Sequence, residues 1–349
     1  MPPTRSRVLG CLAVGAIGDA MGAPIEFDSI AEIRTRFGPE GVTGFAPASG
    51  RLGAITDITQ MTLFTAEGLI RAHARYRDRG ICNVPWIVWR AYCRWLVTQG
   101  GPDIYDADLG SAVSGWLITN EVLQNRRGPD VTCLTALESG RWGTPERPIN
   151  DSRGCGGVMR VAPVGVLARK RSFDLGAQIA AITHGDPTGY LAAGALAVII
   201  NHLLSGRMID DAVRGAAAEL RDRPHHEATL AALNAAVALS ARGRPTPEDL
   251  EGLGRGWFAD EALAIGVCCA LAADGVCDGL LLAVNHSGNS ASTGAIAGNI
   301  LGAHYGFEAL PGDLLDELEG REVIVQIGHD LTDALVDGRA LPSDRYPTY

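Results

Sequence analysis

Four segments of the chain are rich in glycine and polar residues where a core-forming sequence would be apolar. They are residues 53–62, 150–160, 183–190 and 285–294. Each leads into a helical or apolar stretch, and the free backbone N–H groups at a helix start attract phosphates and carboxylates. Any one of them could be an ordinary capped turn. Four in one chain predict the rim of a ligand site.

The cysteines do not predict a disulfide framework or a metal cluster. The eight cysteines include no Cys-x-x-Cys pair and no Cys/His spacing typical of metal ligands. Most lie in apolar helical context, which favours buried free thiols. Cys155, with His184 as a base, could be a thiol nucleophile. Only Arg153 and Arg160 supply positive charge near it, which argues against that role.

The elements that must position these segments are helices. Apolar residues recur at the i, i+3, i+4 spacing of an amphipathic helix along most of the chain. This pattern predicts helices at residues 8–21, 59–79, 85–98, 109–126, 173–184, 191–204, 209–221, 227–241, 260–273, 275–285, 293–305 and 312–337. Thr246 followed by Pro247 predicts a further helix start, and only residues 41–45 could form a short strand. We therefore expect an all-α protein.

The composition fits one helical domain with small-molecule partners. Of the 349 residues, 46% are hydrophobic and 20% are charged, enough apolar material for a substantial core. We expect a compact single-domain orthogonal helical bundle over residues 1–349, with a core at about 8–306 and a C-terminal helix and tail at 307–349. A net charge of −10 without a basic stripe argues against nucleic acid and anionic membrane partners. Residues 5–23 imitate a signal peptide, but Asp19 and closely spaced glycines favour a packed helix and a cytoplasmic location.

Five motifs, taken in chain order, give the sequence a family resemblance. They are Gly18–Phe27, Thr56–Thr62, Gly154–Arg160, Thr183–Tyr190 and Ser287–Gly298. The series resembles the ADP-ribosylglycohydrolase family, the DraG-like and ARH-like hydrolases that remove ADP-ribose from an N- or O-glycosidic linkage. The resemblance runs from about Val8 to Gly306. It implies a compact all-α domain with a central cleft and two Mg²⁺ or Mn²⁺ ions.

The sequence departs from the family at the metal-binding positions. The family takes its ligands from a Thr-Asp-Asp triplet and a later Asp-x-Asp-Ser/Thr, whereas this chain has Ile58 in the triplet and Asn289 and Ala291 in the later element. Three of the four metal-binding carboxylates are therefore missing, and hard divalent cations depend on anionic oxygen ligands. We expect no metal cofactor, or at most one weakly bound Mg²⁺. The oxygen ligands that remain are Asp57, Thr56, Ser292, Asn289 and Glu26.

Other motif residues inherit ligand-binding roles by resemblance. In the family the glycine-rich loop lies against the diphosphate and ribose, which implies that role here for Ser152, Gly154, Cys155, Gly156 and Gly157. His184 inherits a position near the reacting ribose, and Gly288 forms the turn before Asn289. Asp186 stands where close relatives often carry a second His. It is either a carboxylate of the site or a cap of the following helix.

Two functions fit these residues. The first is a divergent, metal-independent glycohydrolase that cleaves an N-glycosidic bond of an ADP-ribosyl or ribosyl-nucleotide small-molecule conjugate. Asp57 or Glu26 would be the catalytic base and Asp186 its partner, because N-ribosyl hydrolysis needs a carboxylate near an oxocarbenium-like centre and an activated water. The alternative is a pseudoenzyme that binds ADP-ribose or a related nucleotide without cleaving it.

Overall fold

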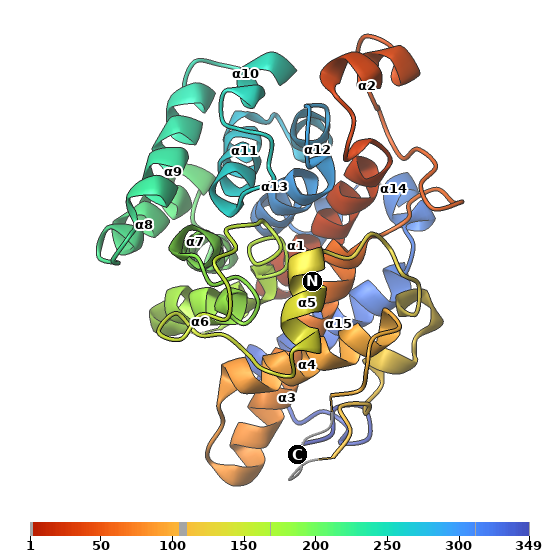
Figure 1. Ribbon diagram of the computed structural model, residues 1–349. Coiled ribbons are helices and arrows are strands. Elements are labelled where there is room, and N and C mark those ends of the chain that lie inside the picture. The colour runs from red at the N-terminus through yellow and green to blue at the C-terminus, as the bar shows by residue number, and fades with distance from the viewer. Residues whose placement is uncertain (1–2, 105–109, 168, 311, 349) are drawn as a thin grey trace.

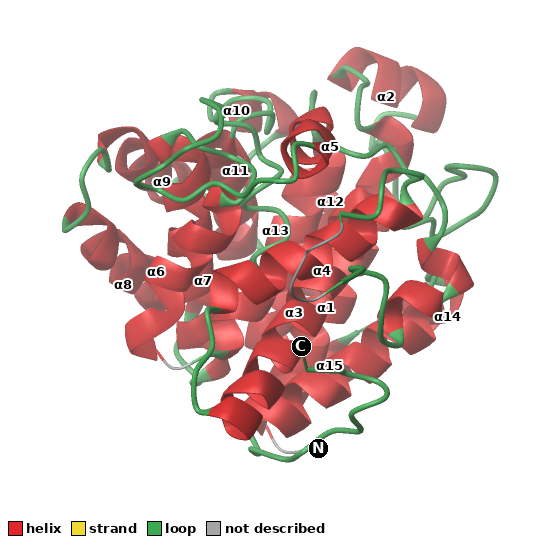
Figure 2. Cartoon of the chain, turned by 60° about the horizontal axis from the view of Figure 1, so that its bottom comes forward, coloured by secondary structure: helices red, strands yellow, loops and turns green. Residues whose placement is uncertain are grey.

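The computed structural model describes residues 3–104, 110–167, 169–310 and 312–348. In this part of the chain the secondary structure is helical, and no β-strand forms (Figure 2). The all-α fold class predicted from the sequence is confirmed. The α-helices, labelled in Figure 1, are α1 (Pro3–Gly22), α2 (Ile30–Phe37), α3 (Asp57–Arg79), α4 (Val84–Thr98), α5 (Val131–Glu138), α6 (Arg169–Ala181), α7 (Pro187–Leu204), α8 (Ile209–Arg221), α9 (Glu227–Ser240), α10 (Pro247–Glu251), α11 (Ala259–Ala272), α12 (Val276–Val284), α13 (Ser290–Tyr305), α14 (Gly312–Glu317) and α15 (Arg321–Leu335). Short 3₁₀ helices are η1 (Ala23–Ile25), η2 (Leu117–Thr119), η3 (Glu121–Leu123), η4 (Ala162–Val166) and η5 (Phe307–Ala309).

Helices α1 and α13 pack backbone to backbone in the middle of the bundle (Figure 1). Glycines make this approach possible, because a Cβ atom on Gly18 would lie 2.0 Å from the carbonyl oxygen of Gly294. A Cβ atom on Gly302 would lie 2.0 Å from the carbonyl oxygen of Gly10. The contact brings the C-terminal end of α1 beside the N-terminal end of α13. Two of the predicted site motifs are thereby fixed to each other.

Helices α1 and α7 are core helices. Thr4–Ile25 and Pro187–Leu204 are long and apolar enough to cross a membrane by length and composition alone. Their apolar windows are 89% and 83% buried inside the protein, respectively. Burial against other helices accounts for their hydrophobicity.

The predicted helix at 109–126 is wrong. Leu109 lies outside the described residues, and the rest of the segment is irregular except for η2 and η3. Gly110 and Gly115 adopt positive φ angles of 74° and 86°, which break a right-handed helix. The predicted strand at 41–45 is also wrong, because these residues form a loop without a ladder.

Other boundaries differ in smaller ways. The predicted helix at 312–337 is divided into α14 and α15, where Gly320 has a φ of 71°. The helix start predicted at Thr246 is confirmed, because the Thr246 side chain caps α10. Two helices missed by the periodicity are α2 and α5, both of which are only eight residues long.

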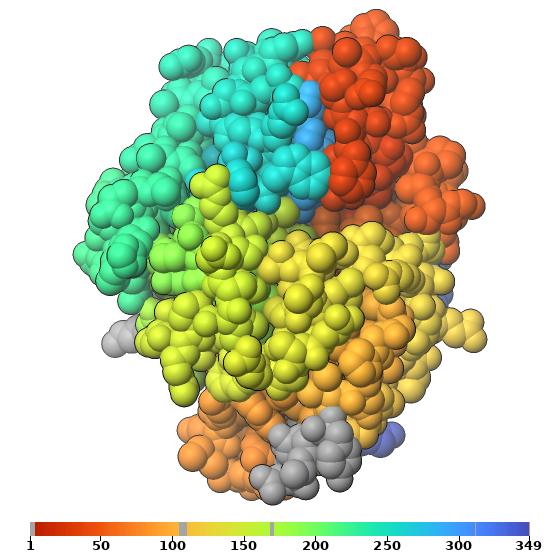
Figure 3. Space-filling view, viewed as in Figure 1, coloured from red at the N-terminus to blue at the C-terminus, as the bar shows by residue number. Residues whose placement is uncertain are grey.

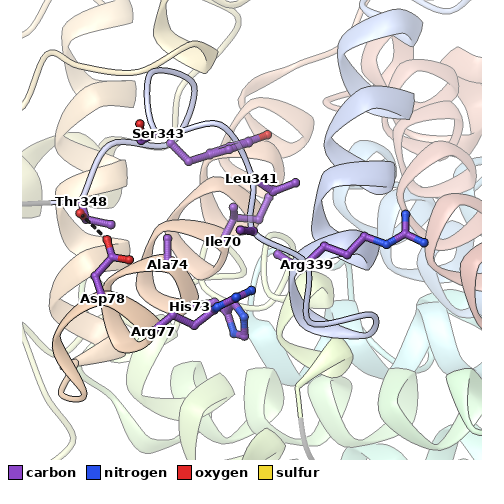
Figure 4. Close-up of a pocket in the computed structure, with 12 residues that line it drawn as sticks. Ile70, His73, Ala74, Arg77, Asp78, Arg339, Leu341, Ser343 and Thr348 are labelled. Atoms are coloured by element: carbon purple, nitrogen blue, oxygen red, sulfur yellow. Dashed lines mark hydrogen bonds between the residues drawn. The ribbon is translucent and has the colours of Figure 1, made fainter.

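The C-terminal tail is ordered against α3 and α15. The Tyr346 side chain is buried and its hydroxyl donates to Asp330 Oδ2 at 2.6 Å. Thr348 Oγ1 donates to Asp78 Oδ2 of α3 at 3.0 Å, and the tail closes a cavity of about 90 Å³ over α3 (Figure 4). His73 lines this cavity. The tail is therefore part of the folded bundle.

Candidate functional site

The site is built on a buried carboxylate, Asp19, in the last turn of α1. Asp19 accepts hydrogen bonds from the N–H of Thr56 at 2.9 Å, the hydroxyl of Thr56 at 2.7 Å and the N–H of Thr59 at 3.2 Å. The hydroxyl of Thr59 is a fourth donor to it. Burial raises the pKa of Asp19 to about 6, although these hydrogen bonds oppose the rise. Asp19 thus fixes the start of α3 on α1, a positioning role that the sequence analysis did not find.

Asp57 is the first residue of α3 and is buried. Its Oδ2 accepts the N–H of Asp130 at 2.9 Å, and its own N–H donates to the carbonyl of Arg127 at 3.1 Å. Burial raises the pKa of Asp57 well above its ordinary value. The N–H of Asp130 opposes this rise, and the negative charges of Asp130, Glu26 and Asp19 add to it. Several carboxylates therefore share one small region.

Glu26 follows η1 and faces the same region. It is only partly exposed, and burial together with the charge of Asp19 raises its pKa to about 7. Its charge in turn raises the pKa of both Asp57 and Cys155. Glu26 is therefore close to half-ionised at neutral pH, which suits a group that exchanges protons.

The glycine-rich loop lies between the loop before α11 and the start of α13. The N–H of Cys155 donates to the carbonyl of Trp257 at 3.0 Å. The amide of Asn289 donates to Cys155 Sγ at 3.2 Å, and Ser292 Oγ lies 3.5 Å from that sulfur. Burial raises the pKa of Cys155 to about 12, so the group is a thiol at neutral pH. This agrees with the sequence argument against a thiol nucleophile.

In the turn before α13, the polar side chain of Asn289 forms a hydrogen bond within the turn itself. Gly288 has a φ of 115°, and a Cβ there would lie 2.2 Å from the carbonyl oxygen of Arg255. Asn289 Oδ1 accepts the N–H of Ser292 at 2.9 Å, which caps α13. Only a glycine fits the turn, and the Asn289 oxygen is already engaged.

His184 lies in the loop between α6 and α7, fully buried. Its Nδ1 is 2.8 Å from the hydroxyl of Thr183, and its Nε2 has no hydrogen-bond partner. Burial lowers the pKa of His184 to about 4, with Asp130 opposing this and Arg160 adding to it, so the ring is neutral at pH 7. A Cβ atom on Gly156 would lie 3.0 Å from His184 Nε2 and 3.0 Å from Asp130 Oδ2. The glycine-rich loop, His184 and Asp130 therefore meet at one point.

Asp186 and Ser152 have local structural contacts. Asp186 Oδ1 accepts the N–H of Thr188 at 2.8 Å and caps α7. The N–H of Asp186 donates to the carbonyl of Ser152 at 3.2 Å, and Ser152 Oγ accepts the N–H of Gly154 at 3.3 Å. Of the two roles left open for Asp186, the structure shows the cap.

The sequence analysis missed Asp130. This residue N-caps α5, with Oδ1 accepting the N–H of Cys133 at 2.7 Å, and it contacts Asp57 through its own N–H. The signal was present as Gly128-Pro129-Asp130 followed by an apolar run, which is typical of a capped helix start.

The family model described as ADP-ribosylglycohydrolase matches residues 1–342. The chain belongs to the ADP-ribosylglycohydrolase family. Its members are hydrolases of ADP-ribosylated substrates, as the resemblance implied.

Two curated relatives carry enzyme names. The chain is 26% identical over 328 residues to the ADP-ribosyl-dinitrogen reductase glycohydrolase of Rhodospirillum rubrum, covering 91% of this chain and 92% of the relative. It is 25% identical over 335 residues to the ADP-ribosylarginine hydrolase Tri1 of Serratia proteamaculans, covering 93% and 78%. A solved structure titled ADP-ribosylglycohydrolase-related protein complex has a TM-score of 0.69 at 23% identity and covers 95% of this chain and 98% of that chain. This last similarity shows the fold.

The residues at the family's two metal positions do not fit a pair of hard divalent ions. Ile58 and Ala291 are buried hydrocarbon side chains, and Asn289 has its oxygen in a helix cap. Mg²⁺ prefers carboxylate and water oxygens, which these three positions do not supply.

The expectation that no metal cofactor is required is nevertheless wrong. The family to which the chain belongs typically depends on a dinuclear Mg²⁺ centre. The structure also brings one ligand atom each from Asp130, Cys133 and His184 within 4.8 Å of one another, a group that could hold a metal ion. The sequence analysis overlooked it because His184 lies about 50 residues from the other two and the three follow no metal-binding spacing.

Proposed function

We propose that the chain is a hydrolase that cleaves an N-glycosidic bond of an ADP-ribosyl or ribosyl-nucleotide small-molecule conjugate. The observation that supports this best is the mutual electrostatic influence of Asp57, Glu26 and Asp130, together with the position of Asp130 Oδ2 beside Gly156 of the glycine-rich loop. Carboxylates beside a phosphate-type loop are the groups that such a reaction needs.

The glycine-rich loop offers free donors for a diphosphate. The N–H groups of Gly154 and Cys155 donate to Ser152 and Trp257 respectively. Among the described residues the N–H groups of Gly156 and Gly157 find no acceptor. We propose that these two donors, which belong to buried residues, bind phosphate oxygens.

An aromatic pair at the rim offers a surface for the nucleobase. Phe27 and Trp257 stack with ring centroids 5.4 Å apart and an interplanar angle of 25°, and Phe27 is 79% exposed. Three surface regions meet on the face shown in Figure 3: the red N-terminal region, the yellow region near residue 130 and the cyan region near residue 255. Phe27 follows Glu26 directly, and the backbone carbonyl of Trp257 accepts the N–H of Cys155, so both residues are anchored beside the site. Aromatic faces of this kind stack on bases without selecting one base over another.

The carboxylates account for the chemistry. Water adds to the anomeric carbon of the ribose as the bond to the leaving nitrogen breaks, and the leaving group takes the electron pair. In its ionised form Asp57 stabilises the oxocarbenium-like centre, and Glu26 accepts the proton of the attacking water. A cationic nitrogen base leaves as a neutral molecule, so it requires no proton from the protein.

Product analysis tests this proposal. The purified chain is incubated with ADP-ribosyl conjugates whose leaving groups range from a pyridinium base to a guanidine, and released ADP-ribose is separated by chromatography. We expect turnover of at least one conjugate, reduced at least about 100-fold in Asp57→Asn. Full activity of Asp57→Asn would show that this carboxylate does not take part.

The replaced metal positions favour a second candidate, a pseudoenzyme that binds ADP-ribose. Ile58, Asn289 and Ala291 remove three family carboxylates without disturbing the turn at Gly288. Calorimetric titration with ADP-ribose separates the candidates. Tight binding without turnover of any conjugate would favour the pseudoenzyme.

A further inference from the structure

Asp130, Cys133 and His184 form a cluster, and the proposed reaction gives the thiol and the imidazole of this cluster no role. Their ligand atoms all lie within 4.8 Å of one another. We propose that these three side chains bind one borderline-soft divalent cation of the Zn²⁺ type, at a place different from the family's Mg²⁺ positions. The proposal is independent of the proposed function, because metal binding is measured without substrate.

The first turn of α5 presents two of the ligands together. Asp130 caps this helix, and its Oδ1 accepts the N–H of Cys133 at 2.7 Å. This hydrogen bond fixes both side chains at the same helix end. Asp130 Oδ2 accepts no hydrogen bond among the described residues, so it remains available to a cation.

The orientation of His184 is the observation that points to a ligand. The residue is fully buried, and its Nε2 is a buried atom with no hydrogen-bond partner in the described part of the chain. Leaving such an atom unpaired is costly. With Nδ1 donating to the Thr183 hydroxyl at 2.8 Å, Nε2 would present its lone pair to the cluster. Metal-binding histidines are commonly oriented through the other ring nitrogen in this way.

The glycine-rich loop packs directly against the cluster. A Cβ atom on Gly156 would lie 2.8 Å from His184 Cε1 and 3.0 Å from Asp130 Oδ2. A larger residue would fill the space next to both ligands. Three protein ligands with an open fourth position are typical of catalytic Zn²⁺ sites.

Arg160 supports the thiol ligand. Its Nη1 donates to Cys133 Sγ at 2.9 Å, and its guanidinium is fully buried over the ring of Tyr92 at 4.3 Å. No carboxylate forms an ion pair with Arg160 among the described residues. A thiolate at Cys133 would give this buried cation the negative partner that it lacks.

The donor set identifies the class of metal. A thiol and an imidazole suit Zn²⁺, Co²⁺ and Fe²⁺, whereas Mg²⁺ takes oxygen ligands in octahedral geometry. Tetrahedral Zn²⁺ with a Zn–S distance of about 2.3 Å separates neighbouring ligand atoms by about 3.5 Å. Because the ligand atoms already lie within 4.8 Å of one another, binding would require the most distant pair to approach by no more than about 1 Å.

Titration of the metal-stripped full chain with Co²⁺ alone tests the site. We expect one equivalent to produce a cobalt–thiolate charge-transfer band, which Zn²⁺ then abolishes by displacement. Cys133→Ser should remove the band, and His184→Ala should weaken Zn²⁺ binding at least about tenfold. Cys277→Ser removes an exposed thiol and Cys155→Ser removes the neighbouring buried thiol, and both should keep the band.

Circular dichroism confirms that each variant is folded. Asp130→Asn preserves the cap of α5, since Asn is also a good N-cap, and should still lower the Zn²⁺ affinity at least about tenfold. An absent band in the wild type, or a band lost in Cys155→Ser or Cys277→Ser instead of Cys133→Ser, would overturn the proposal. Unchanged Zn²⁺ affinity in Asp130→Asn would overturn the three-ligand site.

Discussion

Asp57 and Asp130 are joined at the starts of two helices: the N–H of Asp130 donates to Asp57 Oδ2 at 2.9 Å. The N–H of Asp57 donates to the carbonyl of Arg127 at 3.1 Å, so the link runs in both directions. The first turns of α3 and α5 consequently form one unit. A substitution of either carboxylate is therefore expected to alter the position of the other.

Glu26 predicts a pH dependence of stability. Its pKa is about 7 in the folded protein against an ordinary value of 4.5, so the folded state holds the proton more tightly. The stabilising effect is complete below pH 4.5 and is lost as the pH rises to about 7. Glu26→Gln cannot ionise at this position, so its free energy of unfolding should rise relative to that of the wild type as the pH increases. The change in this difference should be on the order of 3 kcal/mol by pH 8.

Urea unfolding of both proteins at pH 5 and pH 8 measures this difference. If the gap between Glu26→Gln and the wild type were the same at both pH values, Glu26 would not carry the raised pKa. On an active substrate, Glu26→Gln should also remove an ionisation near pH 7 from the rate profile.

The hydrogen bonds of Asp19 predict a large loss of stability when this residue is substituted. Asp19→Asn places an amide group against N–H and O–H donors from Thr56 and Thr59, so buried donors lose their acceptor. We expect a loss of about 2–4 kcal/mol in the free energy of unfolding. Asp28→Asn is the control, because Asp28 forms an exposed ion pair with Arg36, and such pairs contribute about 1 kcal/mol or less. Equal losses in urea unfolding would contradict the anchoring role of Asp19.

The close packing around Gly156 predicts that a larger residue there weakens ligand binding. A Cβ there meets His184 Cε1 at 2.8 Å, so Gly156→Ala should crowd the site where the loop, His184 and Asp130 meet. We expect the dissociation constant for ADP-ribose to rise at least about tenfold, equivalent to about 1.4 kcal/mol. Gly44→Ala is the matched control, since a Cβ at Gly44 has no neighbour within 4 Å. Unchanged calorimetric affinity in Gly156→Ala would place the ligand elsewhere.

Tyr346 predicts that the tail contributes to stability. Tyr346→Phe removes the hydrogen bond to Asp330 and should cost about 1–2 kcal/mol. Tyr346→Ala also removes a buried ring and should cost about 3–5 kcal/mol. Thermal unfolding compares both with Ser343→Ala, at an exposed tail position. A melting temperature for Tyr346→Ala equal to that of Ser343→Ala would mean that the tail is not a structural element.

The helical fold was predictable because apolar periodicity is a local signal. Where glycines with positive φ interrupt an apolar pattern, as at Gly110 and Gly115, the pattern predicted a helix that does not form. The periodicity also missed α5, because an eight-residue helix offers only about two turns.

The candidate site was likewise predictable only in part. Asp57 and the glycine-rich loop lie in motifs that are continuous in sequence, so they were predictable. The cluster of Cys133 and His184 was not, because about 50 residues separate them and only packing brings them together. Asp19 was missed for a similar reason, since nothing near it in sequence shows that its hydrogen-bond partners are Thr56 and Thr59.

The backbone contact between α1 and α13 has a consequence for biosynthesis. Helix α1 leaves the ribosome long before α13, yet the surface that covers it belongs to residues Ser290–Tyr305. A nascent chain thus carries an apolar helix without its partner during most of translation, which is a condition that favours aggregation and chaperone binding. The candidate site cannot assemble until α13 has emerged, so translation products that end before α13 should lack the complete site.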